Sequence, residues 1–349
     1  MTATLHRLPQ PDVTQRSDWH GITRRHVVTG VLGAAILLSA PAWTDDYWLQ
    51  TLTATAIYAA VALSVSLLLG RVGMVSLCQF ALLAVGTWIA LRIGYATGMP
   101  FLVVLLSAGV LTGLLGILVG LPALRLNGLY LALITLMAAA GVTVVLAATQ
   151  FPNGGSGVLG FSNTAIGSTS RLARPGYAAS DSAYYAVVVV VVALLFLLVS
   201  AHVASRPGRA WAAIRQSEST AIAAGVSVVL YKLWAFALAA FITGVAGGLL
   251  AASGGGVTTY QFPTENNILL LAAVLMGGVY GLWGSIVAAV FVKVVPAVLQ
   301  LWGVSADILL IAFGIGVIQT MLLSPQGVAA QIAGDLTALA GRLKRRNKS

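Results

Sequence analysis

Ten apolar runs, joined by short polar or glycine-rich connections, make up most of this chain and limit the folds open to it. They cover residues 27–41, 48–69, 74–91, 101–120, 128–149, 183–203, 232–252, 267–280, 285–302 and 306–323. A helix needs roughly 20 apolar residues to cross a bilayer, so some runs can span it fully and others only in part. Of the 349 residues, 59% are hydrophobic and only 8% are charged, against about 25% in soluble domains. The sequence therefore predicts an all-α, polytopic integral membrane protein with about ten transmembrane or partly spanning helices.

The formal net charge of +10 comes from basic residues in the two ends of the chain and in short connections. This placement follows the positive-inside rule and argues against a nucleic-acid partner. We expect both termini to be cytoplasmic, which requires an even number of crossings and a break near Tyr280–Ser285. The expected divisions are a cytoplasmic arm (1–26), a transmembrane domain (27–323) and a basic cytoplasmic tail (324–349).

The start of the first run, "TRRHVVTGVLGAAILLSAPAW" at residues 23–43, allows two interpretations. Paired arginines before an apolar stretch that ends in small residues are typical of a twin-arginine signal. They are also typical of a first transmembrane helix with positive residues on its cytoplasmic side. We favour the helix, because a polytopic chain follows immediately.

A polar stretch, "GRAWAAIRQSESTAIAAGVSVVLYK", lies within the expected cytoplasmic loop at 204–231 and just beyond it. Pro207–Gly208 is expected to stop the preceding helix, and Arg209–Gln216 to form a helical segment. We expect a second short helix to follow. Ser217 would be its N-cap and Glu218 would lie in its first turn, while Gly225 would end it. Its small apolar face would consist of Ala221, Ile222 and Ala224. Such a helix suits docking into a groove on another protein; an ordinary solvated loop is the alternative.

Polar residues inside apolar runs are the usual markers of a substrate path. Ser64, Ser66, Ser76 and Gln79 gather around a predicted helix break at Gly70 and Gly73, and Thr135 lies within the fifth run. Half-helix ends at such a break would suit a zwitterionic substrate. For any single Ser or Thr, hydrogen bonding to its own helix backbone is the alternative.

Other classes of function lack their markers in this sequence. The chain has no GxxxxGK[ST] phosphate loop, so it cannot itself be an ATPase of that type, and it shows no metal-ligand spacing. An ion-coupled transporter would need a buried carboxylate, yet no Asp or Glu lies in the core of an apolar run. A membrane-embedded enzyme would need a nucleophile, a base or metal ligands that converge on one site, and the sequence shows no such set. We predict a transport subunit with no catalytic residues, no metal and no cofactor.

Four blocks of the chain resemble the permease subunit of branched-chain amino-acid ABC importers, the Liv type. They are "LLLGRVGMVSLCQFALLAVGTW" (67–88), "LRLNGLYLALITL" (124–136), "GRAWAAIRQSESTAIAAGVSVVLYKLWAFALAAFITGVAGGLLA" (208–251) and "LLLAAVLMGGVYGLWGS" (269–285). The resemblance runs from about Tyr58 to Gly327. It implies a multi-pass protein of the bacterial inner membrane that forms the translocation path with a second permease. Two ATP-binding cassette subunits would bind the ATP, and an extracytoplasmic solute-binding protein would deliver the solute.

The resemblance also implies that the polar stretch holds the coupling helix, with Glu218, Ala221 and Gly225 at matching positions. The sequence departs from the family at Thr220 and at Ile222, where Ala and Glu are usual.

The implied substrate is a branched-chain or other small amino acid. Ala140 and Cys78 depart from the family, so urea and short amides remain alternatives. The glycine-rich loop at 151–167 is either a re-entrant lid or a connector, and Lys293 receives no role.

Overall fold

The computed structural model describes residues 44–124, 126, 128–148, 172–254, 257–303 and 306–323, with residues 41, 328 and 331. Within them the chain forms helices and connections and no strand. The long helices are α2 (Asp46–Ser66), α3 (Gln79–Thr97), α4 (Phe101–Gly120), α5 (Leu129–Ala148), α6 (Asp181–Ala204), α9 (Val228–Ala251), α11 (Leu282–Leu301) and α12 (Ala306–Leu323). Shorter ones are α7 (Arg206–Gln216), α8 (Glu218–Ala223) and α10 (Asn266–Gly277). The all-α prediction is confirmed.

Nine of the ten predicted spans correspond to helices of this bundle. The arm, the glycine-rich loop at 151–167, the first span (27–41) except residue 41, and the tail except residues 328 and 331 lie outside the described residues. By length and composition, seven of the described helices can cross a membrane. With 12 residues, α10 reaches only about 18 Å at 1.5 Å per residue, well short of a hydrocarbon core of about 30 Å. The expected break is present slightly earlier than predicted, between Gly277 and Leu282.

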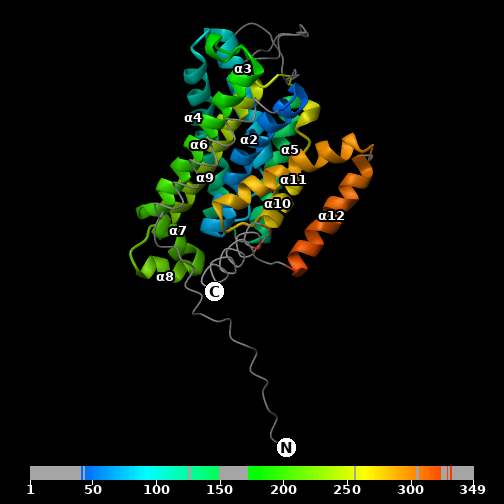
Figure 1. Ribbon diagram of the computed structural model, residues 1–349. Coiled ribbons are helices and arrows are strands. Elements are labelled where there is room, and N and C mark those ends of the chain that lie inside the picture. The colour runs from blue at the N-terminus through cyan, green and yellow to red at the C-terminus, as the bar shows by residue number, and fades with distance from the viewer. Residues whose placement is uncertain are drawn as a thin grey trace, which may run out of the picture.

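The core of the bundle forms around α2 and α9. Helix α2 packs against α3, α6, α9, α10 and α11, while α9 packs closely against both α3 and α4 (Figure 1). The contact between α3 and α9 brings two backbones together, since a Cβ on Gly86 would lie 2.6 Å from the Gly244 Cα. This close packing of small residues is how membrane helices associate without a hydrophobic driving force.

The outer helix faces carry apolar side chains. On α4 and α5, large residues such as Leu106, Leu118, Leu129 and Met137 are exposed in the isolated chain. An apolar exterior of this kind suits lipid or another membrane subunit rather than water. Figure 1 shows α12 at the edge of the bundle, and α7 and α8 together at one end.

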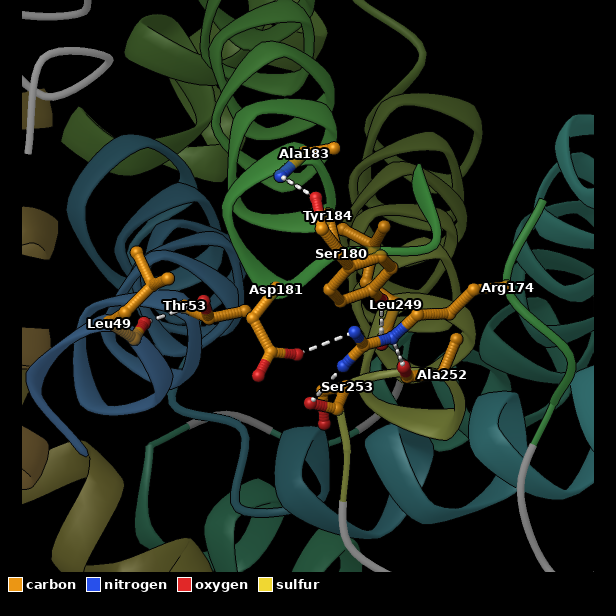
Figure 2. A network of polar contacts seen from close by, with 10 residues as sticks. All are labelled: Leu49, Thr53, Arg174, Ser180, Asp181, Ala183, Tyr184, Leu249, Ala252 and Ser253. Carbon is orange, nitrogen blue, oxygen red and sulfur yellow. Dashed lines mark hydrogen bonds and ion pairs between the residues drawn. The ribbon is translucent and has the colours of Figure 1, made fainter. Parts of the chain in front are cut away.

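At the opposite end from α7 and α8, a polar network joins the start of α6 to the end of α9 (Figure 2). The Arg174 side chain pairs with Asp181 at 2.6 Å and donates to the carbonyls of Ala252 (2.9 Å) and Ser253 (3.0 Å). Its guanidinium lies over the Tyr184 ring, 4.5 Å from the centroid. These two carbonyls directly follow Ala251, the last residue of α9, so a cation caps the C-terminal end of this helix.

Candidate functional site

A discontinuity that we call the first break, residues 67–78, separates α2 from α3. Helix α2 runs on into a π-helical turn, η2 (Leu67–Val72), which ends at Gly73 with a φ of 83°. Residues 73–78 form no helix, and α3 begins only at Gln79, five residues later than the predicted run. Left-handed backbone is routine for glycine and costly for other residues, so Gly73 is the point at which the chain can turn.

The N-terminus of α3 lies inside the bundle, not at its edge. Gln79 contacts Ser64, which precedes the end of η2 by eight residues, or about 12 Å of helix. The segment 73–78 must therefore run back along α2 before α3 starts. A helix that begins inside a bundle presents unpaired backbone N–H groups and a positive dipole end there.

Three buried side chains form a polar cluster at this level, which we call the Gln79 cluster: Ser64 on α2, Gln79 on α3 and Thr243 on α9. The Gln79 Oε1 accepts hydrogen bonds from the Ser64 Oγ (3.2 Å) and the Thr243 Oγ1 (2.9 Å). Each side chain belongs to a residue that is no more than 1% exposed. The cluster ties together three helices that are far apart in sequence.

One end of the Gln79 amide has no partner among the described residues. The Nε2 atom is buried and makes no hydrogen bond with the described residues. Rotating the amide would let Nε2 donate to both hydroxyls, since these can donate to the carbonyls of Val61 (2.7 Å) and Ala239 (2.9 Å), but it would then orphan Oε1. An unsatisfied buried polar group costs about 1–3 kcal/mol, which a hydrogen-bonding solute could recover.

Two further side chains hold the first break and the start of α3 in place. Thr135 on α5 accepts a hydrogen bond from the Leu77 N at 2.9 Å, while its own hydroxyl lies within reach of carbonyls of its helix. Asn267 at the start of α10 accepts from the Phe80 N at 2.9 Å. Thr135 thus holds the backbone of the first break at Leu77. It also lies within hydrogen-bonding distance of its own helix backbone, which was the alternative considered from the sequence.

The structure brings only some of the predicted path residues together. Gln79 is in the cluster and Thr135 and Gly73 shape the break, while Ser76 contacts Cys78, with 3.2 Å between Oγ and Sγ. Gly70, also in the first break, packs against a different segment: a Cβ there would be 2.1 Å from the Val279 O. Sequence reasoning missed Thr243 and Asn267, although each is a polar residue in or beside an apolar run, the signal that identified the others.

A second discontinuity, residues 278–281, joins α10 to α11; we call it the second break. The second break packs against the first break where Val279 meets Gly70. Close to each break in sequence, the Ser285 Oγ on α11 donates to the Ser66 Oγ on α2 at 3.0 Å. Lys293, farther along α11, places its ammonium 4.1 Å from the centroid of the Tyr58 ring on α2. The two breaks are therefore neighbours, although more than 200 residues separate Ser66 from Ser285.

The polar stretch forms two consecutive helices, α7 and α8. The prediction that Pro207–Gly208 stops α6 is wrong: α6 ends at Ala204, and Pro207 lies in the first turn of α7. Proline fits there because the first N–H groups of a helix need no partner within it. Gly208 allows the sharp corner, since a Cβ on it would lie 2.0 Å from the Val203 O.

The predicted ends of the second short helix are confirmed. The Ser217 Oγ accepts from the Thr220 N at 3.3 Å, and Glu218 is the first residue of α8. Gly225 follows the helix with a φ of 78° and donates its N–H to the Ile222 O at 2.9 Å. Glu218 also pairs with Lys232 at 2.8 Å, which fastens α8 to the start of α9.

The small apolar face predicted for docking on α8 is only partly exposed. Ala221 is only 1% exposed and packs into the core, whereas Ile222 is 63% exposed. The chain turns back after Gly225, so that the Val226 N donates to the Ala221 O at 2.9 Å and closes over this position. Ala221 supports α8 from inside, and Ile222 is the apolar residue that α8 presents outward.

Comparison with known proteins matches the sequence of this chain to one family. A family model described as "Branched-chain amino acid transport system / permease component" matches residues 47–321, which include both breaks, α7 and α8. No solved structure matches the chain.

Two curated relatives are similar over most of the chain. The "High-affinity branched-chain amino acid transport system permease protein LivM" of Salmonella typhimurium is 28% identical over 330 residues, covering 89% of this chain and 77% of that protein. LivM of Escherichia coli strain K12 is 28% identical over 280 residues, covering 74% and 66%. With its apolar, multi-helix bundle, this chain belongs to the family of inner-membrane permease components of branched-chain amino acid transport systems.

Proposed function

We propose that this chain, together with a second permease subunit, forms the translocation path of an ATP-driven importer for branched-chain or other small amino acids. In this proposal one of two ATP-binding cassette subunits docks on α8 at the cytoplasmic face, the other docks on the second permease, and the two hydrolyse the ATP. A solute-binding protein delivers the amino acid on the other side. This chain breaks no bond; it opens and closes the path.

The Gln79 cluster is the observation that carries the proposal. A buried amide with one unsatisfied end, at a helix N-terminus inside the bundle, offers a hydrogen bond and a positive dipole end to a passing solute. An α-carboxylate is the group that such a helix end favours. Gln79 would therefore contact the polar end of the amino acid while apolar bundle residues face its side chain.

The acidic residues support this proposal over an ion-coupled transporter. Within the described part of the chain, all of them lie at or just before the N-terminal end of a helix: Asp45, Asp46, Asp181, Glu218, Glu265 and Asp307. Carboxylates there stabilise the helix dipole. A coupling ion inside the membrane would instead require a carboxylate deep in a span.

A second candidate substrate class, urea and short amides, is favoured by the neutrality of the site. The side chains around the start of α3 are uncharged hydroxyls and amides: Ser64, Gln79, Thr243 and Asn267. Such groups can exchange hydrogen bonds with a neutral amide without any charged partner. Uptake measured with labelled leucine and with labelled urea distinguishes the two classes.

Replacing Gln79 tests the proposed path. In vesicles holding the complete complex, Gln79→Leu should reduce uptake by about tenfold or more, because one good hydrogen bond in a buried site corresponds to about that factor. The same variant should unfold no more easily than the wild type, since the unsatisfied amide is removed with the bond. Gln50→Leu makes the same change on the exposed face of α2 and should alter neither property. Undiminished uptake by Gln79→Leu would remove this residue from the path.

A further inference from the structure

Arg215, in the last turn of α7, reaches both breaks at once. Its Nη1 donates to the Gly70 O in the first break. The carbon at the centre of its guanidinium lies 4.6 Å from the centroid of the Tyr280 ring in the second break. One side chain thus joins the helix pair at the end of the bundle to the two discontinuities of the membrane helices.

The contact with the first break involves the whole side chain. A Cβ added to Gly73 would lie 3.2 Å from the Arg215 Cγ, so the aliphatic stem rests against the residue at which the chain turns. The guanidinium then passes on to a carbonyl of η2, near the end of a helix where unpaired carbonyls and a negative dipole end attract cations. The first break leads from Gly73 directly through residues 74–78 to Gln79.

The contact with the second break is made to a ring face. A guanidinium over an aromatic ring within about 6 Å is attracted by the ring quadrupole and can stack flat against it. Tyr280 is one of only four residues that link α10 to α11, so a shift of this ring is a shift of the link.

Arg215 is also fixed to the element that presents α8. The face of α7 that contains Trp211 and Ile214 is buried, and the Trp211 Nε1 donates to the Tyr231 O at 2.9 Å. Ser217, two residues after Arg215, ends α7 and caps α8. Because no flexible linker lies between them, a displacement of α8 must carry the Arg215 backbone with it.

We propose that Arg215 is the residue that transmits movement of α8 to both helix breaks and so to the Gln79 cluster. It touches no solute in this scheme and acts as a positioning residue. The inference rests on the proposed function, which makes α8 the docking point of the ATPase. What is new is the side chain, Arg215, through which docking of the ATPase would alter the path.

The test separates coupling from stability by measuring ATP hydrolysed per solute imported in the reconstituted complex. Arg215→Lys keeps the charge but loses the planar fork and the stacking, and Tyr280→Leu removes the ring. Both should raise the ratio about fivefold or more, the low end of typical couplings between sites, with hydrolysis retained. Tyr280→Phe keeps the ring and should behave as the wild type. Arg209→Gln, on the exposed face of the same helix, is the matched control.

The single cysteine of the chain provides a readout that needs no transport. Cys78 is buried at the end of the first break, one residue before Gln79. In a complex whose other subunits lack reactive cysteines, a non-hydrolysable ATP analogue should change the rate at which a small thiol reagent modifies Cys78. Arg215→Lys should abolish this nucleotide effect, and Arg209→Gln should preserve it.

The outcomes distinguish the two proposals. A wild-type complex without ATP-driven uptake contradicts the proposed function, whereas the Cys78 measurement still tests the link. The inference is overturned if nucleotide leaves the wild-type Cys78 rate unchanged, or if Arg215→Lys keeps the nucleotide effect. It is also overturned if the Arg215 and Tyr280 variants lose hydrolysis and uptake in equal proportion, which is the result expected of a purely structural contact.

Discussion

Two arginines at opposite ends of the bundle are held in different ways. Arg174 has an acidic partner, two backbone carbonyls and a ring face, and its side chain is only 13% exposed (Figure 2). Arg215 has one carbonyl and one ring, and within the described residues it forms no ion pair. Both arginines bridge separate helices, but only Arg174 has its charge neutralised.

The difference indicates which end of the bundle is held rigidly and which end can move. A guanidinium bound to a carboxylate and two carbonyls makes several charge-assisted hydrogen bonds at once, and all must break together. A single bond to a carbonyl and a cation–π contact, the latter worth about 0.5–2 kcal/mol, can be exchanged for others at low cost. The Arg174 end is therefore a clamp between α6 and α9, and the Arg215 end is a joint.

The largest expected effect comes from breaking the clamp. Arg174→Met would leave Asp181 and the carbonyls of Ala252 and Ser253 without this partner and should lower the free energy of unfolding by about 2 kcal/mol. This is less than the 3–5 kcal/mol typical of a fully buried pair, because the Asp181 side chain is 38% exposed. Thermal unfolding of the purified complex measures the loss. If the comparison holds, the ATP consumed per solute stays at the wild-type value; a raised ratio would show that this end also takes part in coupling.

A smaller effect is expected on the outward face of the joint. Ile222→Arg should weaken ATPase binding by about tenfold, or about 1.4 kcal/mol, while the permease remains folded, because this side chain is 63% exposed. Ala221→Arg is the contrasting variant: it forces a charge into a position that is 1% exposed and should reduce the amount of folded protein in the membrane. Binding of the ATPase to membranes that contain equal amounts of each permease separates the two. Full ATPase binding by Ile222→Arg would contradict docking at α8.

The smallest effect concerns the ion pair that fastens α8 to α9. Glu218→Gln keeps a hydrogen-bond acceptor for Lys232 but removes the charge. The Glu218 side chain is 41% exposed but the Lys232 side chain only 3%, so the loss should be about 1 kcal/mol. The measurement is the transport rate at low and at high salt. Salt screens a partly exposed ion pair, so the rate should depend less on salt in the variant than in the wild type. Ser219→Ala, at an exposed position of the same helix, is the control and should match the wild type.

Much of the fold could be predicted from the order of residues alone. A long apolar run must be buried in lipid or protein, and a helix is the one local structure that satisfies its backbone there. The runs therefore located nine helices, and the ends of α8 could be predicted because Ser217 and Gly225 act on neighbouring backbone groups. The glycines at 70 and 73 likewise marked the first break.

Contacts between distant segments could not be predicted in this way. Whether Pro207 ends one helix or begins the next depends on how α7 folds back on α6, and the burial of Ala221 depends on the chain that closes over it. Thr243 and Asn267 reach the start of α3 from α9 and α10, at sequence separations of 164 and 187 residues. The secondary-structure propensity of a short segment does not indicate which residue so far away in the sequence will contact it.

The sequence by itself determined that this chain is a helical membrane protein, roughly where nine of its helices lie, and how α8 is capped, because these follow from hydropathy and from bonds within a few residues. Only the tertiary structure decided that α3 starts inside the bundle, that one end of the Gln79 amide lacks a partner, and that Arg215 touches both breaks. The physical reason is that hydrogen bonds and ring contacts depend on distances of a few ångströms between atoms. Only the packing of helices against one another sets those distances.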